Sequence, residues 1–253
     1  MISKKVFFSV FTIPAAIMCH ECSEFQKRRK NDKNFEIDRR NERLNAEPID
    51  VTPKDGKFPF SGMTPEQIEQ EYGFKRVKIK GLMNMEDEVQ IEGFNRGERG
   101  YYVVNPLYTH VNEDKEPCGI MVNRGFLPLD YSEYRERMLQ QKDGYFEGII
   151  YCGDHLTKYD DNPNTPIADE WYKAVPKELS LAARLKNRED SGVAMLMLVD
   201  FDEEHQEIHP SPPVVKDFTS WKNTPERHNA YQIFWKYATY LNLFANTMFW
   251  LYF

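Results

Sequence analysis

Hydrophobic and polar residues alternate along the middle of the chain. Val77 and Ile79 are separated by lysine, and Val89 and Ile91 repeat the same spacing. A period of two places every second side chain on one face, so each run predicts a half-buried β-strand. Denser apolar runs, which predict more deeply buried strands, follow at 100–108, 118–128, 144–153 and 193–201.

Helical signals interrupt these strands. Thr64 and Gln67 form a capping pattern that predicts a short helix. Residues 170–185 predict another, with Pro176 in its first turn or at a break. Several short strands at near-regular spacing, with one or two inserted helices, predict a mainly antiparallel β-sandwich or open barrel.

The N-terminal end has no such period. It is uncharged from Val6 to Cys19 and reaches membrane-spanning length if a helix continues to Phe25. A secretory signal also has a basic start and a short apolar core, but no small-residue cleavage site follows here. The pattern therefore favours a membrane anchor over a signal.

The C-terminal end carries only one charge, Lys236, after Ala230. On a helix its residues separate into two faces, of which the apolar one suits lipid and the polar one suits another helix or a ligand. An amphipathic helix that closes a soluble core is the alternative. The aromatic run 249–253 favours a second membrane helix. The polar stripe holds His228, Thr239, Asn242 and Asn246 with Tyr231 and Trp235, opposite Ile233, Phe234, Tyr237, Leu241, Phe244, Ala245, Met248 and Leu251.

The expected fold is thus membrane-anchored α+β, with two transmembrane helices flanking a mainly antiparallel β domain. The expected boundaries are an N-terminal transmembrane helix at 1–25, a basic juxtamembrane helix and connector at 26–63, a soluble mainly-β domain at 64–227, and a C-terminal transmembrane helix at 228–253.

Composition excludes several classes of function. A net charge of −7 argues against a nucleic-acid binder, which needs basic surface. Four cysteines are too few for a disulfide scaffold, and we expect Cys118 and Cys152 to be small buried hydrophobes. The chain has no glycine-rich phosphate loop and no nucleophile elbow. We therefore expect a protein that is not an enzyme.

Two histidine clusters are weak candidates for metal binding. The run from Cys19 to Cys22 offers half of a zinc site, and no second pair follows, so cysteines at a membrane border beside a chance histidine are favoured. His205 and His209 lie in an acidic stretch before a proline-rich segment that forbids a helix. We expect no metal site.

Arg124 and His228 each leave two interpretations open. Arg124 could pair with a carboxylate or a propionate, but an exposed arginine at a strand-end turn is favoured by the residues alone. A neutral His228 imidazole at the mouth of the C-terminal helix could ligate a haem iron, with Tyr231 and Trp235 packing against the macrocycle. A water-facing histidine cap is the alternative.

Several motifs in order resemble the Surfeit-locus protein 1 family of cytochrome c oxidase assembly factors. The run Met121–Phe126 is similar to the family's L-V-N-R-G-W signature, the most specific of them. The others are Phe25-Gln26-x-x-Arg29-x-x-x-Lys33, Arg43-Leu44 with Pro48, Gly100–Pro106, Trp171 with 177–179 and 183–184, and His228-x-x-Tyr231-x-x-x-Trp235.

The resemblance implies a function and a location. It implies two membrane helices around a domain in the intermembrane space, anchored in the mitochondrial inner membrane. It implies that the chain assists maturation of the haem-bearing oxidase subunit, with oxidase core subunits and lipid as partners, and that His228 holds haem a. The rival hypothesis is a permanent structural accessory subunit of the oxidase without haem transfer.

The chain also departs from the family pattern. Phe25 and Asp32 replace two tryptophans, and 208–220 takes the place of a glycine-rich segment. The basic run 27–30 would lie outside, against the positive-inside tendency. Acidic insertions at 130–143 and 201–209 offer docking surface.

Overall fold

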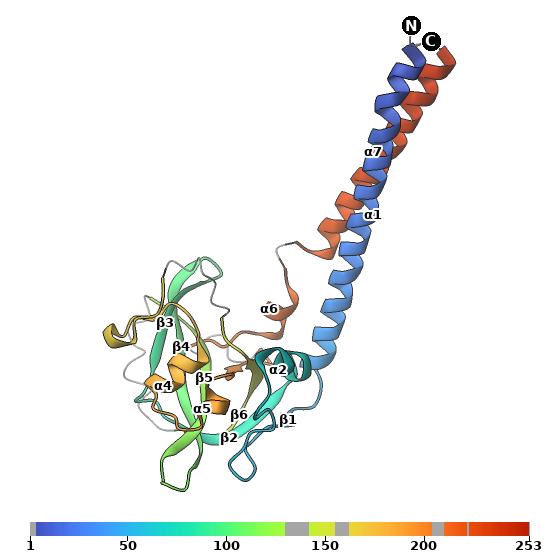
Figure 1. The fold of residues 1–253 in the computed structure, drawn as a ribbon. Coiled ribbons are helices and arrows are strands. Elements are labelled where there is room, and N and C mark those ends of the chain that lie inside the picture. The colour runs from blue at the N-terminus through green and yellow to red at the C-terminus, as the bar shows by residue number, and fades with distance from the viewer. Residues whose placement is uncertain (1–3, 130–141, 155–161, 204–209, 222, 253) are drawn as a thin grey trace. The chain divides into compact units, whose positions relative to one another are not determined.

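The computed structural model describes residues 4–129, 142–154, 162–203, 210–221 and 223–252. The chain forms two compact units (Figure 1). One unit combines Met1–Asn41 with Thr219–Phe253, and the other is Glu42–Phe218. The acidic insertion at 130–141 and both His205 and His209 lie outside the described residues.

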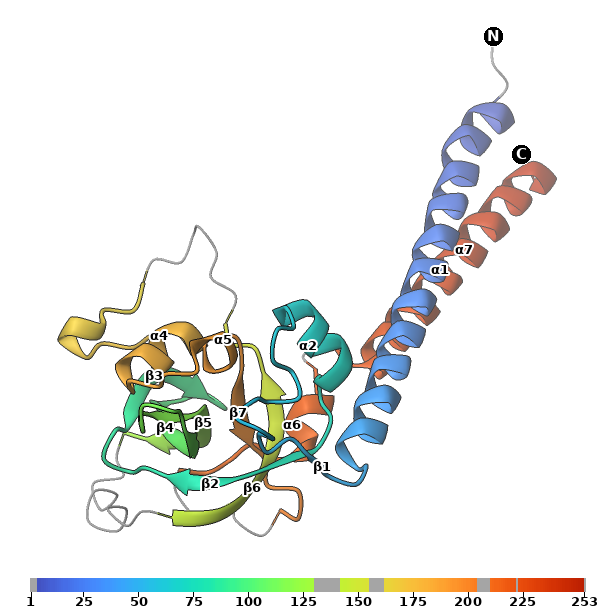
Figure 2. The same ribbon diagram turned by 60° about the horizontal axis from the view of Figure 1, so that its bottom comes forward.

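The first unit is a pair of long helices. Helix α1 runs unbroken over Lys4–Leu44, 41 residues, and α7 runs over Pro225–Tyr252, 28 residues. The two lie side by side and antiparallel (Figures 1 and 2). The N-terminal end of α1 meets the C-terminal end of α7, where Lys5 Nζ donates to the Trp250 carbonyl. The N-terminal apolar helix and the basic juxtamembrane helix expected from the sequence are therefore one continuous helix, and Pro14 lies inside it.

The second unit is built on a seven-stranded sheet in the order β1-β2-β6-β7-β5-β4-β3. Its strands are β1 Ile49–Asp50, β2 Val77–Met83, β3 Val89–Asn95, β4 Glu98–Val111, β5 Pro117–Pro128, β6 Lys142–Tyr151 and β7 Met195–Leu198.

The sheet closes on itself because β2 also pairs with β4, with Leu82 opposite Tyr108. Of the two expected architectures, the barrel therefore describes the sheet and the sandwich does not. Gly81 lies at this seam, where an added Cβ would stand 2.6 Å from the Tyr108 carbonyl oxygen. The ladders are antiparallel except β1–β2 and β5–β7, so the expectation of a mainly antiparallel sheet is confirmed.

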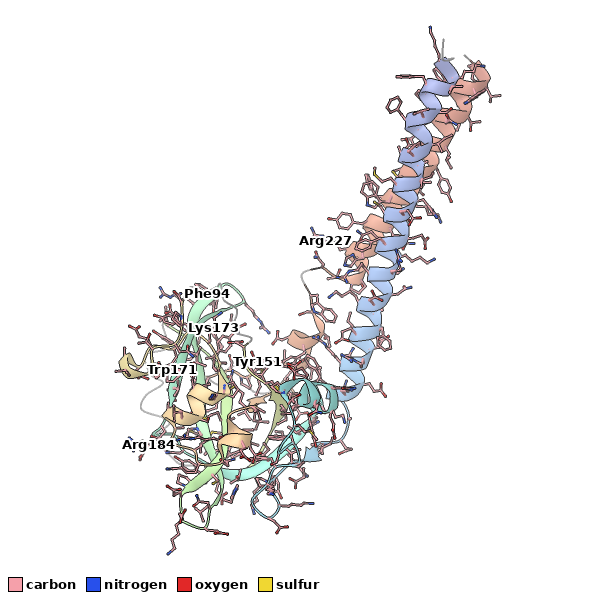
Figure 3. The ribbon with its side chains drawn as sticks, in the orientation of Figure 1. Phe94, Tyr151, Trp171, Lys173, Arg184 and Arg227 are labelled. Atoms are coloured by element: carbon pink, nitrogen blue, oxygen red, sulfur yellow. The ribbon has the colours of Figure 1, made fainter. Side chains whose placement is uncertain are left out.

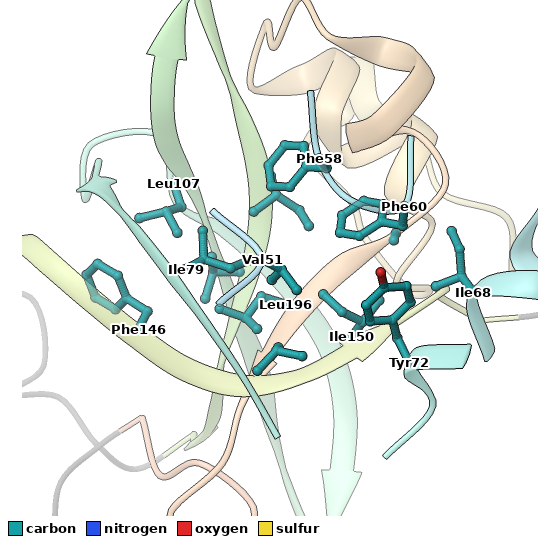
Figure 4. Packing of buried hydrophobic residues seen from close by; sticks show 14 of the residues in the cluster. Val51, Phe58, Phe60, Ile68, Tyr72, Ile79, Leu107, Phe146, Ile150 and Leu196 are labelled. Carbon is teal, nitrogen blue, oxygen red and sulfur yellow. The ribbon is translucent and has the colours of Figure 1, made fainter. Parts of the chain in front are cut away.

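The main core combines inward-facing strand residues with Phe58 and Phe60 from the segment between β1 and α2 (Figure 4). Along β2 the buried positions alternate, so Val77 and Ile79 are both inaccessible to solvent, as their spacing predicts. Helix α2, Pro65–Tyr72, buries Ile68 and Tyr72 in the same core. It begins with the expected capping box at Thr64 and Gln67.

A second core lies where α4, Pro176–Ala182, packs with its flanking segments on β3, β4, β5 and β7. Pro176 is in the first turn of α4, as expected. The helix is shorter than the predicted 170–185. Of that range, the residues before Pro176 are not helical, and Trp171 among them forms a β-bridge with Ile91 of β3. The other helical elements in the part of the chain that the structure describes are η1 Pro166–Ala168, α5 Arg188–Ser191 and α6 Val215–Thr219.

Strand β5 contains a β-bulge. Val103 of β4 faces Gly125 and Val104 faces Asn123, so Arg124 is the extra residue. Gly125 has φ of 123°, and the Cβ of any other residue would stand 2.2 Å from the Ser211 carbonyl oxygen. The Asn-Arg-Gly sequence therefore bends a strand that continues to Pro128, rather than ending it.

Candidate functional site

The polar stripe of α7 faces α1. Asn246 Oδ1 accepts hydrogen bonds from Ser9 Oγ at 2.7 Å and from Thr12 Oγ1 at 3.0 Å. Nearer the start of α7, Ser23 Oγ donates to the Gln232 carbonyl at 3.2 Å. Asn246 therefore meets a helix, one of the two partners that the sequence pattern predicts for the stripe, whereas Thr239 and Asn242 donate to backbone carbonyls within α7.

On α1 the contacting face is made of small residues. Ala16, Cys19 and Ser23 are 3%, 6% and 4% exposed, and their spacing places them on one side of the helix. Small side chains let two backbones approach closely, and buried hydroxyls then bond across the interface. Such contacts are typical of helices that associate inside a membrane.

The outward faces are apolar over 6–25 of α1 and along α7, whereas α1 beyond that range exposes charged side chains such as Lys27. Exposed side chains on α1 include Phe7, Phe11 and Met18, each about 60% exposed. Those on α7 include Phe234, Leu241 and Phe244. The pair thus has polar groups inside and large apolar groups outside, the reverse of a soluble core. The apolar face of α7 is not buried, so an amphipathic helix closing a soluble core does not describe it.

Length and composition distinguish the two helices. Within the described residues, α1 alone is long and apolar enough to cross a membrane, with a mean hydropathy of 1.4 over its apolar window. Helix α7 does not meet that standard. Its tyrosine, tryptophan, asparagine and threonine side chains lower its mean hydropathy.

His228 lies in the first turn of α7, half-buried. Its backbone N–H donates to the Thr224 carbonyl at 3.2 Å. Its ring Nδ1 is 2.7 Å from Gln26 Oε1 of α1. One turn along α1, Lys30 Nζ donates to the Asn229 side chain at 3.1 Å. The histidine is therefore held between two helices and is not a water-facing cap alone.

The two aromatic residues predicted beside His228 differ in their surroundings. Tyr231 is 44% exposed, and its hydroxyl accepts a hydrogen bond of 3.4 Å from Arg227 Nε. Trp235 is half-buried, and its ring is 5.1 Å from that of Phe234, edge to face. An outward aromatic surface therefore begins within one turn of His228.

A tryptophan outside the predicted site fastens the connector to α1. The Trp221 ring lies 4.2 Å from Lys33 Nζ and 4.8 Å from the Arg40 guanidinium carbon. Both are cation–π distances. The basic run of α1 is therefore partly structural, a role that the charge pattern did not indicate.

Arg124 is buried, at 7% exposure, so the exposed arginine that the residues alone favour is wrong. Its Nη1 donates to Asn105 Oδ1 at 3.1 Å and lies 3.6 Å from a Glu88 carboxylate oxygen. The third contact is with the Met85 sulfur at 3.4 Å. A carboxylate partner therefore exists inside the barrel unit, and a propionate partner stays a prediction.

The barrel unit also contains a cleft of about 740 Å³. Tyr102, Phe126, Tyr151 and Tyr172 bring aromatic rings to it, beside Lys173. Tyr151 and Lys173 are labelled in Figure 3. Burial raises the pKa of the Tyr102 and Tyr151 hydroxyls above the ordinary value, and Asp154, which accepts the Tyr151 hydrogen bond, adds to that rise.

Three motifs quoted above converge on this cleft. Tyr102 belongs to the Gly100–Pro106 run, Phe126 to the Met121–Phe126 run, and Tyr172 follows Trp171 directly. Sequence reasoning missed the cleft, because the three segments are far apart in the chain and only strand pairing brings them together.

Of the two metal candidates, Cys19 to Cys22 lies within the described residues, and His205 and His209 lie outside them. Within the described residues, no group of three or more histidine, cysteine or acidic side chains could hold a metal ion. Cys19 is buried on the α7-facing side of α1. Cys118 is buried, as expected, whereas Cys152 is only partly buried and packs against the main core. Burial raises the pKa of the Cys118 thiol, and that of Cys152 to about 11.

These features define a protein of two units. One is a helix pair with polar contacts between the helices and apolar side chains outside, and the other is a small β-barrel. The chain belongs to the SURF1 family, whose model matches residues 16–238 and so covers both units. The resemblance stated from the motifs is thereby confirmed. No curated protein matches the chain in sequence.

Proposed function

We propose that both α1 and α7 cross the mitochondrial inner membrane and that the barrel unit faces the intermembrane space. The apolar outer faces and polar inner faces of the pair support this placement, since lipid favours the first and helix association favours the second. Helix α7 crosses as the partner of α1, which satisfies polar groups that α7 alone would expose to lipid.

Within that setting the chain is a non-enzymatic biogenesis factor of cytochrome c oxidase. It assists maturation of the haem-bearing subunit by holding haem a as cargo, with oxidase core subunits as partners. Membership of the SURF1 family is consistent with an oxidase assembly factor. The single observation that supports the haem step is His228, held by Gln26 where the polar stripe begins.

The residues around His228 fit a haem. The contact to Gln26 uses Nδ1 and leaves Nε2 as a nitrogen that can bind iron. Tyr231, which is exposed, and Trp235, which is half-buried, offer aromatic surface within two turns. A bound haem a would supply an iron that accepts an imidazole nitrogen. His228 would bind that iron, and the outward rings would shield the macrocycle from water.

The test is a haem titration of the purified full chain in detergent. We expect the haem a spectrum of an imidazole-bound iron in the wild type and its loss in His228→Ala. His20→Ala is the matched control, since His20 is an exposed histidine on the same helix pair. An unchanged spectrum in His228→Ala would refute the ligand assignment.

A second candidate function is a permanent accessory subunit of the oxidase. The segment in place of the family's glycine-rich run favours it, because that segment is fixed to the barrel. Ser211 and Phe126 exchange two backbone hydrogen bonds of 2.9 Å, and Asp200 N–H donates to the Pro213 carbonyl at 2.9 Å. Such anchoring suits a static part more than one that hands over cargo.

Quantitative mass spectrometry of the mature oxidase separates the two functions. Presence only in assembly intermediates supports the biogenesis factor. Retention at one copy per mature oxidase supports the accessory subunit and refutes the first proposal.

A further inference from the structure

The contact between Gln26 and His228 joins residues 202 positions apart on two different helices. It is the one hydrogen bond to the His228 ring among the residues that the structure describes. The Nδ1 to Oε1 distance of 2.7 Å is short for a nitrogen–oxygen hydrogen bond. The imidazole of His228 and the amide of Gln26 are therefore in direct hydrogen-bond contact.

The acceptor in this contact decides which nitrogen carries the proton. An amide oxygen can only accept, so Nδ1 must donate to Gln26 Oε1. In a neutral imidazole the lone pair then lies on Nε2. Gln26 thus selects one tautomer, and it turns Nε2 away from α1.

Glutamine suits this task better than a carboxylate would. A carboxylate beside the ring stabilises the imidazolium, which has no lone pair for a metal. A neutral amide orients the ring without favouring that charged form.

The surrounding contacts make the pair rigid. Ser23 bonds to the Gln232 carbonyl on one side of Gln26, and Lys30 bonds to the Asn229 side chain on the other. Both lie within about one turn of Gln26 along α1. They fix the register of the two helices and so hold Oε1 opposite Nδ1.

We propose that Gln26 is a positioning residue that holds His228 as the Nδ1–H tautomer and presents Nε2 to the iron of haem a. This inference rests on the proposed function of His228. Its first test does not need haem, so the two can fail separately.

The first experiment measures the tautomer directly. Nitrogen-15 NMR of histidine-labelled full chain in detergent, without haem, reports which ring nitrogen is protonated, and His228→Ala assigns the signal. We expect Nδ1–H in the wild type and a shift toward Nε2–H in Gln26→Leu. Gln26→Glu keeps an acceptor oxygen at this position, unlike Gln26→Leu, and should therefore retain Nδ1–H. Persistence of Nδ1–H in Gln26→Leu would overturn the proposal.

The second experiment measures haem a affinity and midpoint potential. Loss of a group that orients a metal ligand typically weakens metal binding at least tenfold. We therefore expect Gln26→Leu to bind haem a about tenfold more weakly. The control is Gln232→Leu, which removes a glutamine side chain from the same helix pair and keeps the backbone carbonyl that Ser23 contacts.

The outcomes separate the two hypotheses. If His228→Ala binds haem a like the wild type, the proposed function fails. If His228→Ala loses haem a while Gln26→Leu matches Gln232→Leu in affinity and potential, only the role of Gln26 is overturned.

Discussion

Arg124 occupies a bulge in β5, and the bulge explains why it is buried. In a regular strand, side chains alternate between faces, but the extra residue of a bulge is free of that alternation. Its guanidinium reaches Asn105, Met85 and Glu88 instead of water.

Removing that guanidinium should destabilise the barrel strongly. Arg124→Leu deprives Asn105 and the partly buried Glu88 of the charge they face, and leaving such acceptors without it costs about 2 kcal/mol in the free energy of unfolding. Denaturant unfolding of the full chain in detergent, followed by circular dichroism, measures the loss.

The exposed ion pair of Arg96 with Asp217, at 63% and 37% exposure, provides the control. Arg96→Leu should cost less than about 1 kcal/mol. Equal losses for the two variants would show that burial does not strengthen the Arg124 contacts.

Asp190 is a buried carboxyl, 6% exposed, and burial raises its pKa above the ordinary value. A raised pKa in the folded state means that the charged form costs stability above that pKa. The cost fades as pH falls toward the pKa of the unfolded chain. Asp190→Asn should therefore be more stable than the wild type at pH 7, by about 1 kcal/mol, and nearly equal at pH 4.

Thermal unfolding across that pH range checks this prediction. An Asp190→Asn advantage that grows as pH falls would contradict the assignment.

For single residues, the sequence predicts which side chains can take part in binding better than it predicts which partners they contact. The period of the C-terminal run placed His228 on the polar stripe without showing what it contacts. Gln26 could not be found that way, because its partner lies 202 residues away and no local pattern records a contact between helices. Arg124 was misjudged because Asn-Arg-Gly is typical of turns, and a bulge uses the same residue types.

At the scale of elements, the two long helices depend on one another. Ala16 of α1 is almost fully buried in the pair, at 3% exposure, while Ile17 beside it is 58% exposed. Neighbouring residues on one helix thus have opposite environments, which gives a direct way to probe the interface.

Ala16→Leu should force the helices apart, since overpacking a tight interface costs about 1–3 kcal/mol. A disulfide between cysteines placed at Ser9 and Asn246, whose side chains are 2.7 Å apart, reports pairing in membranes. We expect its yield to fall about tenfold with Ala16→Leu. Ile17→Phe, which enlarges the outer face, should leave the yield unchanged, and equal loss in both would argue against this interface.

Strand elements were predicted closely because their periods are local. The alternation around Val77 and the dense run ending at Pro128 both became strands at nearly the predicted bounds. The helix over 170–185 was predicted too long, because Trp171 bridges to Ile91 in the sheet and so leaves the helix. Tertiary pairing of that kind overrides local propensity.

At the scale of the whole molecule, the sequence predicted a barrel or sandwich between two helices, and the structure selects the barrel. Closure depends on the pairing of Leu82 with Tyr108, which no sequence period encodes. Membrane crossing by α7 stays a prediction, since the helix is too polar on average to be assigned by hydropathy.

A charge on the outer face of α7 tests that crossing. Leu241 is 68% exposed, and arginine at the centre of a membrane helix costs about 3 kcal/mol. Leu241→Arg should therefore increase the fraction of the chain released by alkaline carbonate. Lys236→Arg, which keeps an existing charge, should not. Unchanged retention of Leu241→Arg would contradict a lipid-facing Leu241.

The bonds from Asn246 to Ser9 and Thr12 bear on how the chain is made. Thr12 also donates to the Phe8 carbonyl at 3.1 Å, so α1 can satisfy that hydroxyl by itself during synthesis. The Asn246 amide has no such local contact among the described residues, and it is synthesised after α1. If both helices cross the bilayer as proposed, α1 must already be inserted before α7 can insert with its Asn246 amide paired. The proposed order of insertion is therefore α1 first and α7 second, because α7 needs the hydroxyl groups of α1 to satisfy Asn246.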